Sequence, residues 1–184
     1  IPLDRSGVPP LVFEKWSFML NGFVPDFRLQ HMRALRAELP ADLYAELRGS
    51  SDSETLFLLA GAAIRGGATL PEALERVAKT VYDRVGRESE AQMNLILSDG
   101  ERIAAVRSGT LLETNSLYLA KRPPFAPDGI VLASERLDPG AVWEPVNGHS
   151  WIEIGPQLEV QGEGLFFYES LRTPTWDINP SSAS

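Results

Sequence analysis

Apolar side chains recur at helical spacing through the first half of the chain, and signals for helix ends bound most of these segments. We expect helices over residues 28–39, 42–47, 52–65 and 70–85. Asp26 is the expected cap of the first helix, and Pro40 ends it. The third helix opens with Ser51-Asp52-Ser53-Glu54, which fits the capping-box pattern, and it ends at Gly66-Gly67.

From residue 91 the hydrophobic period changes from about 3.6 to about 2 residues, which indicates strands. Residues 93–98 and 102–107 flank Asp99-Gly100 and predict a hairpin. Other strands are expected over residues 16–20, 116–120, 130–134, 150–154, 157–160 and 165–168. Residues 1–13, punctuated by Pro and Gly, are expected to be irregular. Helices followed by a strand meander predict an α+β fold with a largely antiparallel sheet.

The chain is long enough for one domain with a substantial core, since 43% of its 184 residues are hydrophobic. We assign residues 1–169 to that domain. Residues 170–184 are rich in Pro and Ser, and we expect them to form a mobile tail.

Charge and composition exclude several classes of function. The 17 basic and 25 acidic residues give a net charge of −8, so neither nucleic acid nor an anionic membrane is an expected partner. The longest apolar stretch, residues 55–64, is too short to cross a bilayer, and no secretory signal is visible, so we expect a cytoplasmic protein. With no cysteine and two histidines, neither a metal site nor a cofactor is expected.

Asn21-Gly22 interrupts an apolar run and admits two interpretations. Asn-Gly between alternating hydrophobic residues is a strong hairpin signal, which predicts a tight turn. Alternatively, the Asn21 amide and the Gly22 backbone N–H lie together at a strand end, where both would donate to the oxygen of a reacting carbonyl group. Asp52 raises a similar choice, because it either complements the dipole of its helix or holds a substrate ammonium group.

Several motifs, taken in order, resemble a known family. "WSFMLNG", "SSDSETLF", "NLILSDGERIAAVR", "SLYLA" and "IVLASERLD" follow one another with the spacing of a class II glutamine amidotransferase domain, of the N-terminal-nucleophile (Ntn) hydrolase type. The resemblance covers residues 1–154 and is greatest for the hydrolases of ergothioneine biosynthesis that remove γ-glutamate from a hercynylcysteine sulfoxide conjugate. It implies an αββα sandwich of mainly antiparallel sheets, of which this chain is the C-terminal two-thirds.

The resemblance also implies site residues. Asn21 and Gly22 would form the oxyanion hole, and Asp52 would bind the α-ammonium of the γ-glutamyl group. Leu20 stands where the family usually has His, which leaves the Asn-Gly pair intact. Ser134-Glu135 matches a stretch that normally continues with Pro, where this chain has Arg136. We interpret that stretch as structural.

We interpret three further candidates as core or surface residues and not as catalytic ones: His149, Tyr118 and Trp143.

The family's nucleophile is an N-terminal cysteine, which is absent here, as is the upstream arginine that holds the substrate α-carboxylate. A chain without cysteine cannot form a thioester, so the resemblance implies that a Cys-bearing segment or companion chain supplies the nucleophile. We then expect Ile1 to lie beside a surface that other residues complete. Two alternatives stay open: an inactive partner subunit that keeps the γ-glutamyl pocket, and an unrelated α+β binding domain.

Overall fold

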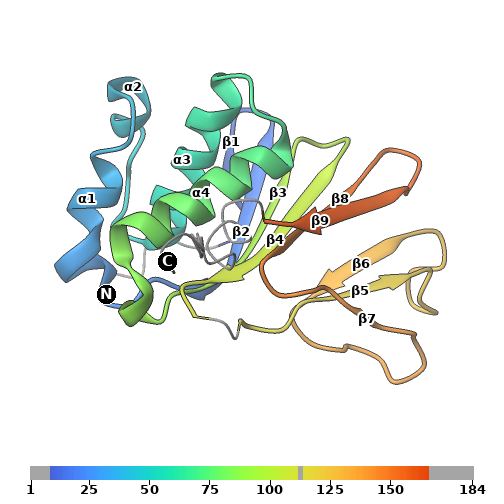
Figure 1. Cartoon of the computed structure of the whole chain (residues 1–184). Coiled ribbons are helices and arrows are strands. Elements are labelled where there is room, and N and C mark those ends of the chain that lie inside the picture. The colour runs from blue at the N-terminus through green and yellow to red at the C-terminus, as the bar shows by residue number, and fades with distance from the viewer. Residues whose placement is uncertain (1–8, 112–113, 166–184) are drawn as a thin grey trace, which may run out of the picture.

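The computed structural model describes residues 9–111 and 114–165, which form two antiparallel sheets with helices on one side (Figure 1). The larger sheet has six strands in the order β1-β2-β3-β4-β8-β9. Its strands are β1 (Leu11–Phe13), β2 (Trp16–Phe23), β3 (Gln92–Ser98), β4 (Ile103–Gly109), β8 (Ser150–Ile154) and β9 (Val160–Gly164). The smaller sheet has the order β6-β5-β7 and consists of β5 (Tyr118–Lys121), β6 (Ile130–Ala133) and β7 (Glu144–Pro145).

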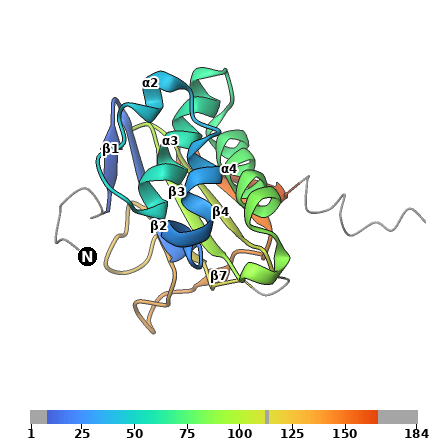
Figure 2. The same ribbon diagram turned by 90° about the vertical axis from the view of Figure 1, so that its left-hand side faces the viewer.

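Two long helices, α3 (Asp52–Arg65) and α4 (Leu70–Val85), cover one face of the larger sheet and lie in front of its strands in Figure 2. Phe18 of β2 stacks on Phe57 of α3 with ring centroids 5.3 Å apart, within the main core. The shorter helical segments are the π-helix η2 (Phe27–His31), α1 (Met32–Arg36), α2 (Ala41–Tyr44) and the 3-10 helix η3 (Arg87–Ser89). The packing of α3 and α4 on the larger sheet makes the helices one layer of the fold and that sheet the next.

The smaller sheet packs on the opposite face of the larger one and forms a second core. Its buried members are Ala105, Leu117, Leu119, Val146 and Ile154. The expected α+β fold with mainly antiparallel sheets is therefore confirmed. In the part of the chain that the structure describes, no helix covers the outer face of the smaller sheet (Figure 1).

The smaller sheet leaves part of this second face uncovered. Along β2, side chains alternate, so that Phe18 points to the helices while Met19 and Phe23 point the other way. Val12 of β1 pairs with Ser17 and shares the face of Met19. Val12, Met19 and Phe23 are 70%, 42% and 51% exposed. The β1–β2 end of the inter-sheet face thus presents apolar side chains to solvent, and we call these three residues the uncovered face.

The end signals of the two long helices are confirmed, although one capping interaction is only half formed. Ser51 Oγ accepts a hydrogen bond from the Glu54 N–H at 3.2 Å, but the Glu54 carboxylate bonds elsewhere. At α4 the full capping box forms between Thr69 and Glu72. The Thr69 backbone N–H donates to the Glu72 carboxylate and lowers the pKa of Glu72.

The first expected helix, over residues 28–39, was wrong in form and length. A π-helix begins at Phe27 and α1 ends at Arg36, well before Pro40. The Asp26 side chain does not cap the π-helix, because the Asp26 backbone is in the left-handed conformation (φ 48°). Its carboxylate accepts a hydrogen bond from Gln30 Nε2 at 3.2 Å. The next helix occupies residues 41–44 instead of 42–47.

Two expectations about strands need correction. Residues 11–13 form strand β1, which pairs with β2 across a turn at Glu14-Lys15 in the stretch expected to be irregular. The last strand begins at Val160 because residues 155–159 form a turn in which the Gly155 N–H bonds to Glu159 O at 2.9 Å. The strand expected over 165–168, apart from buried Leu165, and the tail at 170–184 lie outside the described residues.

Candidate functional site

Asn21 and Gly22 lie inside strand β2, so the hairpin-turn interpretation is wrong. Asn21 pairs with Asn94 and Gly22 with Met93, both on β3, and the strand continues to Phe23. A turn cannot form there because the chain stays extended to complete this pairing. Asn21-Gly22 therefore lies near the C-terminal end of a strand, as the second interpretation requires.

Gly22 has a backbone conformation that excludes a side chain. Its φ is +147°, and a Cβ at this position would lie 2.0 Å from the Gln92 carbonyl oxygen of the neighbouring strand. A Cβ at such a distance is a severe clash with backbone, so only glycine fits. Glycine here lets β2 and β3 stay in close register beside Asn21.

The Asn21 side chain is exposed and held by one hydrogen bond. Its Oδ1 accepts from Nδ2 of Asn94 at 3.2 Å. The Asn21 Nδ2 has no hydrogen-bond partner among the described residues, and the residue as a whole is exposed. An unused N–H donor is therefore present on the inter-sheet face at the end of β2.

Asp52 is joined directly to the same strand end. It is the first residue of α3, after the N-cap Ser51, and its Oδ2 accepts from the Val24 backbone N–H at 2.9 Å. Its Oδ1 accepts from the Ser53 N–H at 2.7 Å and from Ser53 Oγ at 3.3 Å. The carboxylate is half-buried and fixed in orientation. Its contact with the Val24 backbone places Asp52 at the same end of β2 as Asn21 and Gly22, two residues beyond Gly22.

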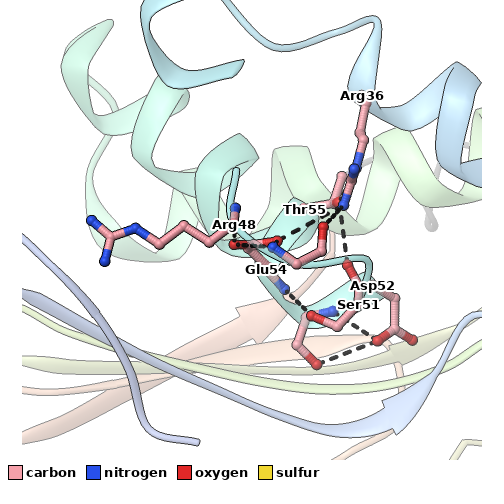
Figure 3. Close-up of polar contacts among 8 residues, drawn as sticks. Arg36, Arg48, Ser51, Asp52, Glu54 and Thr55 are labelled. Carbon is pink, nitrogen blue, oxygen red and sulfur yellow. Dashed lines mark hydrogen bonds and ion pairs between the residues drawn. The ribbon is translucent and has the colours of Figure 1, made fainter. Parts of the chain in front are cut away.

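A buried ion pair fixes the loop that leads to Asp52 (Figure 3). The Glu54 carboxylate, 8% exposed, accepts from the backbone N–H groups of Arg48 at 2.7 Å and Gly49 at 2.9 Å. Arg36 lies 3.8 Å from Glu54 and donates to Gly49 O at 2.8 Å and to Thr55 Oγ1 at 3.1 Å. The loop over residues 48–51 is therefore tied to α1 and to α3 at once.

Removal of the Glu54 carboxylate should destabilise the fold strongly. Glu54→Ala removes the acceptor of two loop N–H groups and the ion-pair partner of Arg36, and we expect a loss of about 3 kcal/mol in the free energy of unfolding. Urea denaturation of the intact protein measures this loss. Glu46→Ala, on the exposed surface nearby, is the matched control and should change stability by less than about 0.5 kcal/mol. Equal losses in the two variants would contradict the structural role of Glu54.

Two buried polar residues were missed by the sequence analysis as partners of the site. Glu54 was interpreted only as a capping partner, and Asn94 was not singled out. Both are buried, at 8% and 1% exposure. For Asn94 the signal was an amide between apolar residues of a strand, since buried polar groups need a hydrogen-bonded partner. Glu54 stands in a polar stretch and carried no such signal.

The other residues named from sequence lie in or beside the smaller sheet. Arg136 stacks over the ring of Tyr118 at 5.1 Å, and Ser134 O accepts from Ser116 Oγ at 2.7 Å. Trp143 is buried, with its Nε1 donating to Asp138 O at 2.9 Å.

His149 is buried as well, and its Nδ1 lies 3.4 Å from Ser108 Oγ. Leu20 packs against the helix-facing core.

Two cavities, of about 570 and 580 Å³, lie elsewhere and are not lined by Asn21, Gly22 or Asp52. Within residues 9–111 and 114–165, no cluster of three or more His, Asp or Glu side chains is arranged to hold a metal ion. Of the helices in the described part of the chain, none has the length and apolar character needed to span a membrane.

No protein-family model matches the chain. Over 154 residues it is 25% identical to the γ-glutamyl-hercynylcysteine sulfoxide hydrolase of Mycobacterium tuberculosis strain H37Rv, and this match covers 84% of the chain. The chain spans about half the length (53%) of that curated relative.

Solved structures share the fold. A glutamine aminotransferase class-II domain protein from Silicibacter pomeroyi superposes with a TM-score of 0.69 and 23% identity, covering 88% of this chain and 72% of that chain. Glutamine phosphoribosylpyrophosphate amidotransferase from B. subtilis does so with a TM-score of 0.62 and 16% identity, covering 88% and 32%. The chain thus has the Ntn-hydrolase-like fold of the class II glutamine amidotransferase domains, and its sequence resembles that of a γ-glutamyl-hercynylcysteine sulfoxide hydrolase.

Proposed function

We propose that this chain is part of a hydrolase of γ-glutamyl amide bonds whose nucleophile is a cysteine on a segment outside the 184 residues. The observation that carries the proposal is the 2.9 Å hydrogen bond from the Val24 N–H to the Asp52 carboxylate. This contact holds an anion beside the strand end where Asn21 presents an unused N–H donor. A γ-glutamyl group carries an ammonium and a carbonyl group, which need such partners.

In the proposed reaction, a cysteine thiolate attacks the γ-carbonyl carbon and the C–S bond forms as the carbonyl electron pair moves to oxygen. Asn21 Nδ2–H and the Gly22 N–H donate to that oxyanion, while Asp52 holds the α-ammonium. Collapse of the tetrahedral intermediate breaks the C–N bond, and the leaving nitrogen takes a proton from solvent, which balances the proton that the thiol gave up when it formed the thiolate. Water then hydrolyses the thioester, releasing glutamate and the thiol.

The uncovered face supports a missing segment. Val12, Met19 and Phe23 expose apolar side chains on the face of the sheet that also carries Asn21. A segment that covered this face would bury them and place its own residues beside the Asn21 amide. The length of the curated relative, about twice the part matched here, leaves room for such a segment.

For the substrate, we propose a γ-glutamyl conjugate of a thiol-histidine, as in γ-glutamyl-hercynylcysteine sulfoxide. The support is the name and the 25% identity of the curated relative. A second candidate is a catalytically inactive subunit that binds γ-glutamyl compounds, and the absence of cysteine from the 184 residues favours it. The two candidates differ in whether the native protein releases glutamate.

The test is an assay of the native protein, purified from its source with whatever chains accompany it. We expect release of glutamate from γ-glutamyl amides, fastest with the γ-glutamyl-hercynylcysteine sulfoxide. Binding of γ-glutamyl compounds without release would favour the inactive subunit. A protein that neither binds γ-glutamyl compounds nor releases glutamate would contradict both candidates.

A further inference from the structure

Asn94 is a buried amide in the centre of the larger sheet, and it contacts Asn21 of β2 and the Ser116 carbonyl group. It lies on β3 directly opposite Asn21 and is 1% exposed. Met93 and Leu95, its neighbours along the strand, are fully buried apolar residues. A polar side chain buried at this position therefore needs hydrogen-bond partners.

The contacts of Asn94 define the orientation of both amides. Asn94 Nδ2 donates to Asn21 Oδ1 at 3.2 Å and to the Ser116 carbonyl oxygen at 2.7 Å. Because Ser116 O can only accept, the Nδ2 end of Asn94 must face it, and an amide nitrogen has two hydrogens to give. Asn21 must then present Oδ1 to Asn94, which turns its own Nδ2 the other way.

The Ser116 carbonyl is itself a fixed point. The Arg107 guanidinium donates to the carbonyl oxygens of Asn115 at 2.7 Å and Thr114 at 3.3 Å, just before Ser116. The Asn115 N–H donates to Gln92 Oε1 at 2.9 Å. Asn94 is therefore anchored to a loop that the sheet holds in place, and this restraint passes on to the exposed Asn21 amide.

One feature of Asn94 points to a role beyond structure. Its Oδ1 is buried and has no hydrogen-bond partner among the described residues. An unpaired buried acceptor destabilises a fold, and an apolar residue of similar size would avoid that cost. The benefit of Asn94 thus lies in its two donated hydrogen bonds.

We propose that Asn94 is a positioning residue, which holds the Asn21 amide with Nδ2 directed at the oxyanion of the hydrolytic reaction. This inference rests on the proposed function. Without Asn94, the exposed Asn21 amide is free to rotate about its Cβ–Cγ bond. For part of the time it then presents Oδ1, an acceptor that repels an oxyanion. Asn94 supplies no group to the substrate and acts through Asn21.

The test is a double-mutant cycle between Asn94 and Asn21 in the native protein, measured with a γ-glutamyl amide substrate. We expect Asn94→Leu to lower kcat about tenfold, the effect of one lost hydrogen bond, with KM unchanged. In the Asn21→Ala background, Asn94→Leu should have no further effect on kcat. Leu97→Met, a buried change on the same strand, is the control and should keep the wild-type kcat.

Asn94→Ala gives a second variant if the leucine cannot be accommodated, and urea denaturation shows whether each variant folds. A tenfold loss of kcat that persists in the Asn21→Ala background would overturn the inference, as would a wild-type kcat in both position-94 variants. If the wild-type protein releases no glutamate, the proposed function itself fails. The wild-type measurement thus separates the two failures.

Discussion

Asn21→Ala should lower kcat for γ-glutamyl amide hydrolysis by about 100- to 1000-fold, with little change in KM. The exposed Asn21 amide presents an unused Nδ2–H on the inter-sheet face, and its orientation is set by the hydrogen bond from Asn94. The oxyanion exists only in the transition state, so an interaction with it affects turnover and not substrate binding. Steady-state kinetics of the native protein and the variant give both constants.

Asn21→Asp is the matched variant, because it keeps the size of the side chain and replaces the donor with an acceptor. It should be at least as inactive as Asn21→Ala. A wild-type kcat in Asn21→Ala would remove Asn21 from the reaction, leaving it a strand residue with a structural bond to Asn94.

Asp52→Asn should raise KM for γ-glutamyl substrates by about 100-fold, since a fixed carboxylate that pairs with an ammonium is replaced by a neutral amide. The amide of the variant keeps one acceptor oxygen, for the hydrogen bond that Val24 N–H now gives to Oδ2, and loses the one that Ser53 gives to Oδ1. We therefore expect the variant to fold with reduced stability, which urea denaturation measures alongside the kinetics. Any fall in kcat would then report the position of the substrate in the site.

The control for Asp52 is a substrate that lacks the α-amino group, namely a monoamide of glutaric acid with the same leaving amine. Wild type and Asp52→Asn should hydrolyse it with similar KM values, because neither makes the ion pair. If Asp52→Asn weakens both substrates equally, Asp52 supports the fold through Val24 and Ser53 and does not recognise the ammonium.

Local signals predicted the parts of the fold that depend on neighbouring residues. The bounds of the two long helices, 52–65 and 70–85, match the expectation because Ser51 and Thr69 cap them with their own side chains. Asp99-Gly100 likewise joins β3 to β4, since a two-strand hairpin requires no information from elsewhere in the chain.

Features that depend on distant residues were not predictable. Asn21-Gly22 has the sequence of a turn, but it is extended because β2 pairs with β3, which lies about 70 residues further along the chain. Asn94 meets Asn21 through this same pairing, and the sequence shows only an amide in an apolar strand. Glu54 bonds to Arg48 and Gly49 instead of closing its capping box, because the loop packs over the start of α3.

The most direct test of a cysteine-dependent γ-glutamyl hydrolase is acid quenching of the native protein during turnover, followed by peptide mass spectrometry. We predict a γ-glutamyl group in thioester linkage on one cysteine, in a peptide from outside these 184 residues. The adduct should be lost when the quenched sample is returned to neutral pH with a thiol. Glutamate release with no such adduct, or with an adduct on a residue of this chain, would contradict a cysteine-dependent mechanism of this kind.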